Sequence, residues 1–230
     1  MNEQRATREH HIRVSRTARY YMIGPDDAPD VWFVCHGYAQ LARYFLRQFE
    51  PLDDGSRLIV APEALNRYYF ETAPGVHGAD ARVAGTWMTR EDREHEIDDY
   101  VAYLDALYLA IHGDGAARRV VALGFSQGAA TVSRWAARGR ARIDDVILWA
   151  SGLAPELSPG PELLRGARLC VALGDADPQI DERSVADAEQ RMRAAGLDFR
   201  LFRYAGGHRV EPAALRELAA LLGTAGSAEV

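Results

Sequence analysis

Short apolar runs bounded by turn-forming residues recur along the chain and are separated by stretches with helical spacing. A continuous apolar run is typical of a strand covered on both faces. We expect buried strands at residues 31–35, 58–61, 120–123, 146–150 and 169–173, and a last strand at 199–204. Residues 10–15 and 19–23 alternate in the manner of an antiparallel ribbon, which predicts an antiparallel edge at the start of the sheet.

Apolar residues between these runs return every three or four positions, as they do on one face of a helix. The clearest case begins after the capping-box-like residues 89–92 and continues to Gly113. Further helices are expected at residues 44–52, 129–139, 181–195 and 212–222. Alternation of strands and helices predicts an α/β fold with a mostly parallel central sheet, helices on both faces and a ligand site at the carboxyl ends of the strands.

Residues 63–88 follow neither period and are rich in aromatic side chains. A long irregular segment inside a folded domain is often functional, and this one could form a mobile lid. We expect it to line a site. Its large apolar side chains could form an acyl-binding pocket or pack the segment onto the domain: Tyr68, Tyr69, Phe70, Trp87 and Met88.

Length and composition narrow the class of protein. A chain of 230 residues with 48% hydrophobic and 26% charged residues suits a single domain spanning 1–230, with residues 1–9 and 224–230 loosely attached. No apolar run is long enough for a membrane span, and the charged N-terminus lacks the apolar core of a signal peptide, so we expect a cytoplasmic protein. These features leave the oligomeric state open, as monomer or homodimer.

Charge and cysteine usage argue against two kinds of partner. The net charge of −6 and the dispersed arginines predict no binding of nucleic acid. Cys35 and Cys170 each lie in an apolar run, where cysteine usually behaves as a small buried hydrophobe. Without a Cys-x-x-Cys motif or paired histidine spacing, we expect no metal site.

The pentapeptide Gly124-Phe125-Ser126-Gln127-Gly128 stands between the expected strand at 120–123 and the expected helix at 129–139. This order is that of a nucleophile elbow, in which a sharp turn lifts a serine hydroxyl above the end of a sheet. The glycines allow strand and helix to approach closely. The motif alone should occur by chance in about one chain of this length in ten, so its context decides.

A nucleophilic serine needs a histidine base and an acid that orients it, in the chain order serine, acid, histidine. His208 is the one histidine that follows the pentapeptide, and it comes directly after the last expected strand. The loop after the strand ending at Leu173 carries two candidate acids, Asp175 and Asp177. We favour Asp177, because Asp175 suits a turn that bonds loop amides.

Stabilisation of a tetrahedral intermediate requires two backbone N–H groups directed at its oxyanion. Gln127, at the positive end of the helix that follows Ser126, is expected to supply one. The loop after the strand ending at Cys35 should supply the other from Tyr38, with Gly37 permitting close approach.

Together, His36-Gly37, the pentapeptide, Gly174-Asp175-Ala176-Asp177-Pro178 and Gly207-His208 resemble the signatures of the phospholipase/carboxylesterase family of α/β-hydrolases, which includes acyl-protein thioesterases and bacterial carboxylesterases. The resemblance implies an α/β-hydrolase fold and a serine esterase that needs no metal or cofactor. Its substrates would be small carboxylic esters of short-to-medium acyl chain. A thioesterase, a small peptidase, or a non-catalytic ligand-binding protein on the same scaffold are the alternatives.

Overall fold

The computed structural model describes residues 7–70, 78, 81–113 and 118–223. Residues 7–19 are largely exposed and carry no regular secondary structure. The expected ribbon is therefore wrong for residues 10–15, and only β1 (Tyr20–Ile23) forms a strand there. The expectations for residues 1–6 and for the tail at 224–230 lie outside the described residues.

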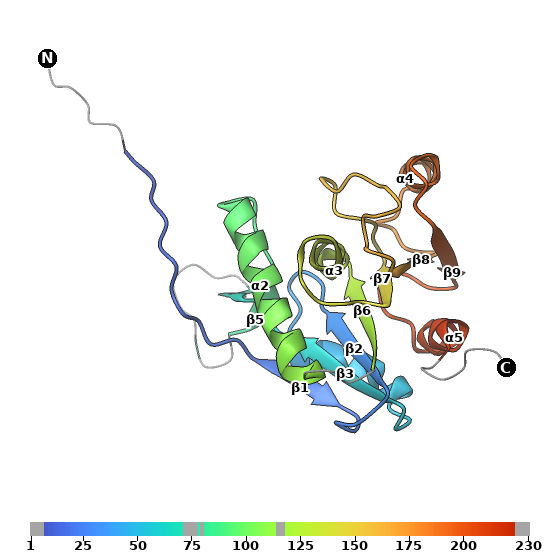
Figure 1. Cartoon of the computed structure of the whole chain (residues 1–230), viewed down its shortest axis with the longest axis horizontal. Helices are drawn as coiled ribbons and strands as arrows, with labels where there is room; N and C mark the ends of the chain where they lie inside the picture. Colours follow the sequence, from blue (N-terminus) through green and yellow to red (C-terminus); the bar gives the residue numbers. More distant parts are fainter. Residues whose placement is uncertain (1–6, 71–77, 79–80, 114–117, 224–230) are drawn as a thin grey trace, which may run out of the picture.

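A seven-stranded sheet forms the centre of the molecule (Figure 1), in the order β1-β3-β2-β6-β7-β8-β9. Strand β1 pairs antiparallel with β3, and the other neighbours pair in parallel. This confirms the predicted α/β-hydrolase fold with an antiparallel N-terminal edge. The six remaining strands of the sheet are β2 (Asp30–Cys35), β3 (Arg57–Pro62), β6 (Arg119–Phe125), β7 (Asp145–Trp149), β8 (Arg168–Gly174) and β9 (Phe199–Tyr204).

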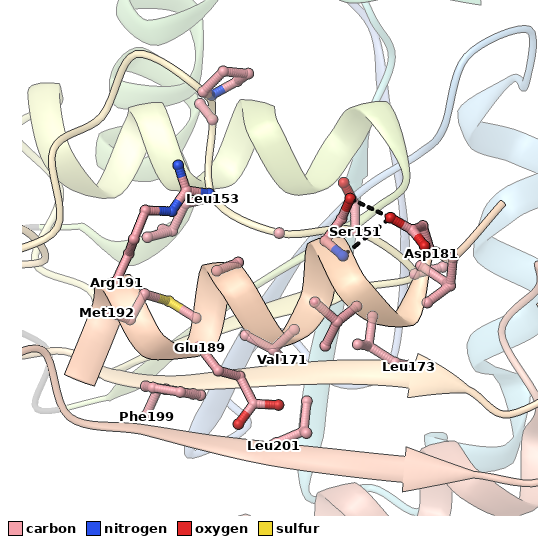
Figure 2. Close-up of a pocket in the computed structure, with 18 of the residues that line it drawn as sticks. Ser151, Leu153, Val171, Leu173, Asp181, Glu189, Arg191, Met192, Phe199 and Leu201 are labelled. Carbon is pink, nitrogen blue, oxygen red and sulfur yellow. Dashed lines mark hydrogen bonds between the residues drawn. The ribbon is translucent and has the colours of Figure 1, made fainter. Parts of the chain in front are cut away.

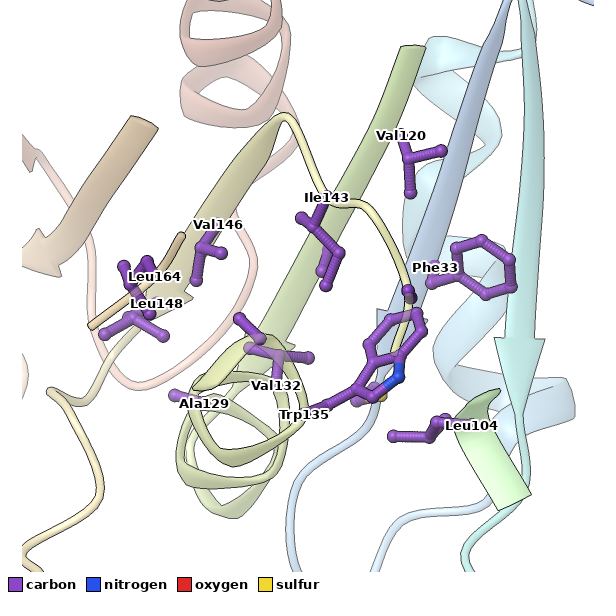
Figure 3. Close-up of a cluster of buried hydrophobic side chains, with 14 of the residues drawn as sticks. Phe33, Leu104, Val120, Ala129, Val132, Trp135, Ile143, Val146, Leu148 and Leu164 are labelled. Atoms are coloured by element: carbon purple, nitrogen blue, oxygen red, sulfur yellow. The ribbon is translucent and has the colours of Figure 1, made fainter. Parts of the chain in front are cut away.

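Helices cover both faces of the sheet, because successive side chains of each buried strand point to opposite sides. One face packs against α2 (Arg93–His112) and α3 (Gln127–Arg138), with α4 (Glu182–Ala194) towards one edge. Figure 3 shows Val132 and Trp135 of α3 directed into this core, and Trp135 meets the ring of Phe33 edge-on at 5.3 Å. The other face packs against α1 (Ala42–Phe45), the 3₁₀ helix η1 (Leu46–Leu52) and α5 (Pro212–Leu222).

Part of the segment at 63–88 is more regular than its sequence predicts. Strands β4 (Asn66–Tyr69) and β5 (Val83–Thr86) pair antiparallel to form a separate two-stranded sheet. Each strand has four residues, too few for the alternation of polar and apolar positions to stand out from the sequence. Residues 71–77 and 79–80 lie outside the described residues, so the lid stays a prediction.

Candidate active site

Ser126 occupies a sharp turn between β6 and α3, as the pentapeptide predicts. Its backbone has φ 53° and ψ −115°, a conformation that side-chain-bearing residues rarely adopt. A Cβ atom on Gly124 would lie 2.0 Å from the carbonyl oxygen of Gly128, and one on Gly128 would lie 2.1 Å from that of Cys35. Both positions therefore exclude any larger residue, which is the physical reason for the motif.

Ser126, His208 and Asp177 form a continuous chain of hydrogen bonds. The Nδ1 atom of His208 lies 2.7 Å from Oδ2 of Asp177, and its Nε2 atom lies 3.1 Å from Oγ of Ser126. A carboxylate can only accept, so Nδ1 carries the proton and Nε2 is free to accept from the serine hydroxyl. The Asp177 side chain is fully buried, and its Oδ1 atom accepts the backbone N–H of Gln179 at 2.9 Å.

The loops that carry the acid and the histidine are bonded to each other. A Cβ atom on Gly174 would lie 2.4 Å from the carbonyl oxygen of Gly206, so the loops after β8 and β9 are in backbone contact. Ala176 donates its N–H to Gly206 at 2.9 Å, and Asp175 donates its N–H to Tyr204 at 3.0 Å. Asp175 is exposed in this arrangement, whereas Asp177 faces His208.

Two aromatic residues that no sequence motif indicates, Trp149 and Tyr204, hold the loop that carries His208 in place. The indole N–H of Trp149 is shared between the hydroxyl of Tyr204 at 2.8 Å and the carbonyl of Arg209 at 3.0 Å. The Tyr204 hydroxyl in turn lies 3.1 Å from the same carbonyl. The backbone next to His208 is therefore tied to strands β7 and β9.

The turn after β2 leaves one backbone donor for a ligand. Gly37 donates to the side-chain oxygen of Gln40 at 2.8 Å, Ala39 to Gly85 at 2.9 Å, and Gln40 back to Gly37 at 3.3 Å. In the part of the chain that the structure describes, the N–H of Tyr38 has no acceptor. Phe125 lies between this turn and the histidine: a Cβ atom added to Gly37 would lie 2.9 Å from Cδ1 of its ring, and the centroid of that ring is 5.0 Å from the ring centroid of His208.

Gln127 has two parts with separate contacts. Its backbone N–H is at the first position of α3, where no partner exists within the helix. Its side chain bonds the segment after β5: Nε2 donates to the Met88 carbonyl at 3.0 Å, and Oε1 accepts the N–H of Trp87 at 3.1 Å. This side chain therefore fastens residues 86–88 to the start of α3.

His36 is a structural residue at the base of the turn. The Ala64 N–H donates to its Nε2 atom at 3.1 Å, so its protonated Nδ1 donates to the carbonyl of Gly37 at 2.8 Å. Burial lowers the pKa of His36 to about 4, which keeps the ring neutral. Glu63 lies nearby with its side chain fully buried, and burial raises the pKa of this carboxyl group.

The structure places the five residues expected to form an acyl pocket in two groups, one buried in the core and one on or next to strand β4. Trp87 is 1% exposed, and its indole N–H donates to the carbonyl of His36 at 2.8 Å, so its side chain packs the segment onto the domain. Met88 packs against the same core and lies 3.4 Å from a nitrogen of Arg134. Both belong to the packing alternative, because they anchor the segment rather than line an opening.

Tyr68 and Tyr69 lie on strand β4, and Phe70 directly follows that strand. The ring of Tyr68 is 5.9 Å from that of Tyr38, Tyr69 is half exposed, and Phe70 stacks with the guanidinium of Arg82 at 5.1 Å. None of the five lines the cavity next to Ser126. For Tyr68, Tyr69 and Phe70 a substrate contact stays a prediction.

That cavity has a volume of about 500 Å³ and opens onto Ser126 and His208. It extends between helix α4 and strands β8 and β9, with the loop at 150–159 as a wall (Figure 2). No motif in the sequence indicates this cavity. The apolar spacing along α4 predicts which side faces the sheet, but it does not show how far from the sheet the helix lies.

The two cysteines are not suited to act as nucleophiles. Both are buried, and burial raises the pKa of the Cys35 thiol strongly and that of Cys170 to about 11. Each therefore stays a protonated, unreactive thiol at neutral pH.

One group of side chains has the composition of a metal site. His11, Asp92 and His95 bring their ligand atoms within 4.8 Å of one another, all exposed and without a role in the hydrogen-bond chain of Ser126. The cluster joins residues from the N-terminal arm and the start of α2, a pairing that motif spacing does not reveal.

No helix among the described residues is long and apolar enough to cross a membrane.

The model of the dienelactone hydrolase family matches residues 58–209, a span that contains Ser126, Asp177 and His208. The chain belongs to the dienelactone hydrolase family. Membership confirms that this protein is a carboxylic ester hydrolase, as the sequence motifs predict. In a comparison with curated proteins, no match is found.

Solved structures similar to this dienelactone hydrolase family member share its fold at low sequence identity. Acyl-protein thioesterase 2 from Zea mays has a TM-score of 0.66 at 17% identity, over 90% of this chain and 98% of that one. A carboxylesterase from Mesorhizobium loti has a TM-score of 0.64 at 16% identity, over 90% and 95% of the two chains. A phospholipase/carboxylesterase from Dyadobacter fermentans has a TM-score of 0.55 at 15% identity, over 90% and 96%. These neighbours agree with the resemblance that the motifs carry.

Proposed function

We propose that this member of the dienelactone hydrolase family cleaves small carboxylic esters of short-to-medium acyl chain by nucleophilic catalysis, with Ser126 as nucleophile, His208 as base and Asp177 as the residue that orients it. The observation that carries the proposal is the position of His208, which contacts Asp177 Oδ2 through Nδ1 and Ser126 Oγ through Nε2. Such a base makes a serine hydroxyl nucleophilic at neutral pH.

In the first half of the reaction, Nε2 of His208 takes the hydroxyl proton as Oγ of Ser126 bonds to the ester carbonyl carbon. The carbonyl oxygen becomes an oxyanion, which the N–H groups of Tyr38 and Gln127 stabilise. The unoccupied donor of Tyr38 and the place of Gln127 at the start of α3 support this role. His208 then gives its proton to the departing alkoxide. The alcohol departs, and the acyl group remains bonded to Ser126 Oγ as an acyl-enzyme.

In the second half, His208 takes a proton from water while the water oxygen attacks the acyl carbon. Collapse of the second tetrahedral intermediate breaks the bond to Ser126 Oγ, which recovers its proton from His208, and the carboxylic acid leaves. Asp177 holds Nδ1 protonated throughout, so Nε2 alone exchanges protons. Its burial and the N–H donated by Gln179 keep this carboxylate in place.

A fluorophosphonate probe with mass-spectrometric mapping tests the nucleophile directly. We expect a single labelled residue, Ser126, and a loss of labelling in Ser126→Ala. Turnover of p-nitrophenyl butanoate should fall by about 10⁶ in kcat in the same variant, by analogy with measured triads. Folded protein that is not labelled would favour a non-catalytic binding protein, and faster turnover of a matched thioester or amide would favour those substrates over oxygen esters.

The expected location in the cytoplasm stays a prediction.

A further inference from the structure

We infer that the cavity between α4 and strands β8 and β9 holds the unbranched acyl chain of the ester, and that a charged residue of its lining limits that chain to medium length. The inference rests on the proposed function, because it takes Ser126 as the atom that carries the acyl group. Ser126 and His208 are both part of the cavity lining, so an acyl chain bonded to Ser126 Oγ has this opening beside it.

The sheet side of the cavity is an apolar surface made by alternate residues of two neighbouring strands. Val171 and Leu173 of β8 face it together with Phe199 and Leu201 of β9. Val171 is directly paired with Leu201 in the register of the two strands. Leu201 and Phe199 are only half buried, although both are large apolar side chains in the sheet.

The helix side presents a matching apolar stripe. Val185, Ala188 and Met192 are spaced by three and four residues, so they share one face of α4, and all three line the cavity. Of the residues of this helix, only Met192 is buried. Figure 2 shows Met192 of α4 on the side of the helix towards Val171, Phe199 and Leu201, across the open space.

The partly buried side chains of Val185, Phe199 and Leu201 leave apolar area exposed to this cavity, and a ligand that fills it would remove that area from water. Each methylene buried in such a site contributes about 0.8 kcal/mol. The volume of about 500 Å³ is in the range of small-molecule sites. An alkyl chain suits the part of the lining made by strands β8 and β9 and the apolar stripe of α4 better than a polar group does.

A charged side chain also lines the cavity. Glu189 lines the cavity one turn before Met192, and its carboxylate lies 3.5 Å from a guanidinium nitrogen of Arg193. The Arg193 guanidinium also stacks on the ring of Phe199 at 4.8 Å. A longer alkyl chain would have to displace water from Glu189 without giving it a hydrogen bond, which is unfavourable. This ion pair therefore sets the upper limit of chain length.

The experiment compares kcat/KM for p-nitrophenyl acetate, octanoate and palmitate. Wild type should prefer octanoate. Val185→Trp, which fills the middle of the cavity, should lower the octanoate-to-acetate ratio at least about tenfold, the equivalent of losing the burial of about two methylenes. Glu189→Leu should raise the palmitate-to-octanoate ratio. Ala186→Trp is the matched control, because Ala186 is exposed on the same helix and does not line the cavity.

Failure of the cavity inference and failure of the proposed function give different results. If wild type is labelled by the fluorophosphonate but Val185→Trp keeps the wild-type ratio, or Ala186→Trp lowers it as much, the cavity does not hold the acyl chain. If wild type is neither labelled nor active, the proposed function is wrong. The cavity is then judged by calorimetric binding of octanoate, which should occur in wild type and be lost in Val185→Trp; its absence from wild type overturns the inference.

Discussion

The Nε atom of Arg134 lies 2.6 Å from Oε1 of Glu156, and this ion pair joins helix α3 to the loop that forms one wall of the cavity. Arg134 is buried and also donates to the hydroxyl of Tyr100 at 3.1 Å. Glu156 contacts a second arginine, Arg93, at 2.7 Å. The hydrogen bond from Arg134 is the main reason that the pKa of Glu156 is lowered to about 2.

Replacing Glu156 by glutamine should destabilise the protein by about 2 kcal/mol, because the buried guanidinium of Arg134 loses its carboxylate partner. Urea denaturation at neutral pH measures the change. Glu94→Gln is the matched control, since Glu94 is 64% exposed and contacts Arg93 and Arg138 at the surface; it should cost less than about 0.5 kcal/mol. Equal losses in the two variants would contradict a special role for the Arg134 pair.

The same ion pair predicts a dependence of stability on acid. The folded-state pKa of Glu156 is depressed from 4.5 to about 2, so its contribution is complete above pH 4.5 and is lost as the pH falls towards 2. Glu156→Gln has no such group. The stability difference between wild type and variant should therefore shrink across this window in denaturation curves recorded at successive pH values.

His36 predicts a second pH window, most of which lies above that of Glu156. Its pKa is depressed from 6.5 to about 4 by burial, so the unfolded chain binds more protons than the folded one between these values. Wild type should lose about 3 kcal/mol from this group as the pH falls from 6.5 to 4. The loss should be absent from His36→Gln, and parallel stability curves for the two proteins would show that His36 does not titrate in this way.

The choice between the two aspartates can be tested by activity. Asp177→Asn should lower kcat by about 10⁴, because the amide no longer fixes the tautomer of His208. Asp175→Asn should change kcat little, since Asp175 is exposed and its backbone bond to Tyr204 is retained. A larger loss in Asp175→Asn would reverse the assignment of the acid.

The backbone contacts at the elbow predict a strong effect of one added methyl group. Gly128→Ala should prevent folding or cost more than about 4 kcal/mol, because its Cβ would lie 2.1 Å from the carbonyl oxygen of Cys35. Gly152→Ala is the control, as nothing lies within 4 Å of its added Cβ. Thermal denaturation and fluorophosphonate labelling should separate the two variants, and a stable, labelled Gly128→Ala protein would contradict the elbow geometry.

Much of the fold could be predicted because its signals are local. The five central strands of the sheet, β2, β3, β6, β7 and β8, are nearly continuous apolar runs, and the helix that begins at Arg93 has a regular apolar stripe. Strands β4 and β5 were missed because each is four residues long and depends on its partner for stability. The edge ribbon was predicted too long, since residues 10–15 have the alternation of a strand but no neighbour to pair with.

The residues of the hydrogen-bond chain at the site could be predicted from the sequence for a different reason. The carboxyl ends of parallel strands meet at one edge of a sheet, so Ser126, Asp177 and His208 could be brought together from strand order alone. The cavity could not be predicted, because it depends on the distance between α4 and the sheet. The two alternatives for Trp87 could not be separated, since an aromatic residue in an irregular segment has the same local sequence whether it faces substrate or the core.

The hydrogen bonds of Trp149 have an optical consequence. Its indole N–H contacts the carbonyl of Arg209, one residue from His208, while its ring is fully buried. Indole emission responds to the polarity around the ring and to the partner of its N–H group. Fluorescence of a protein in which Trp32, Trp87 and Trp135 are replaced by phenylalanine would therefore report, without substrate or label, whether the loop that carries His208 is seated on the sheet.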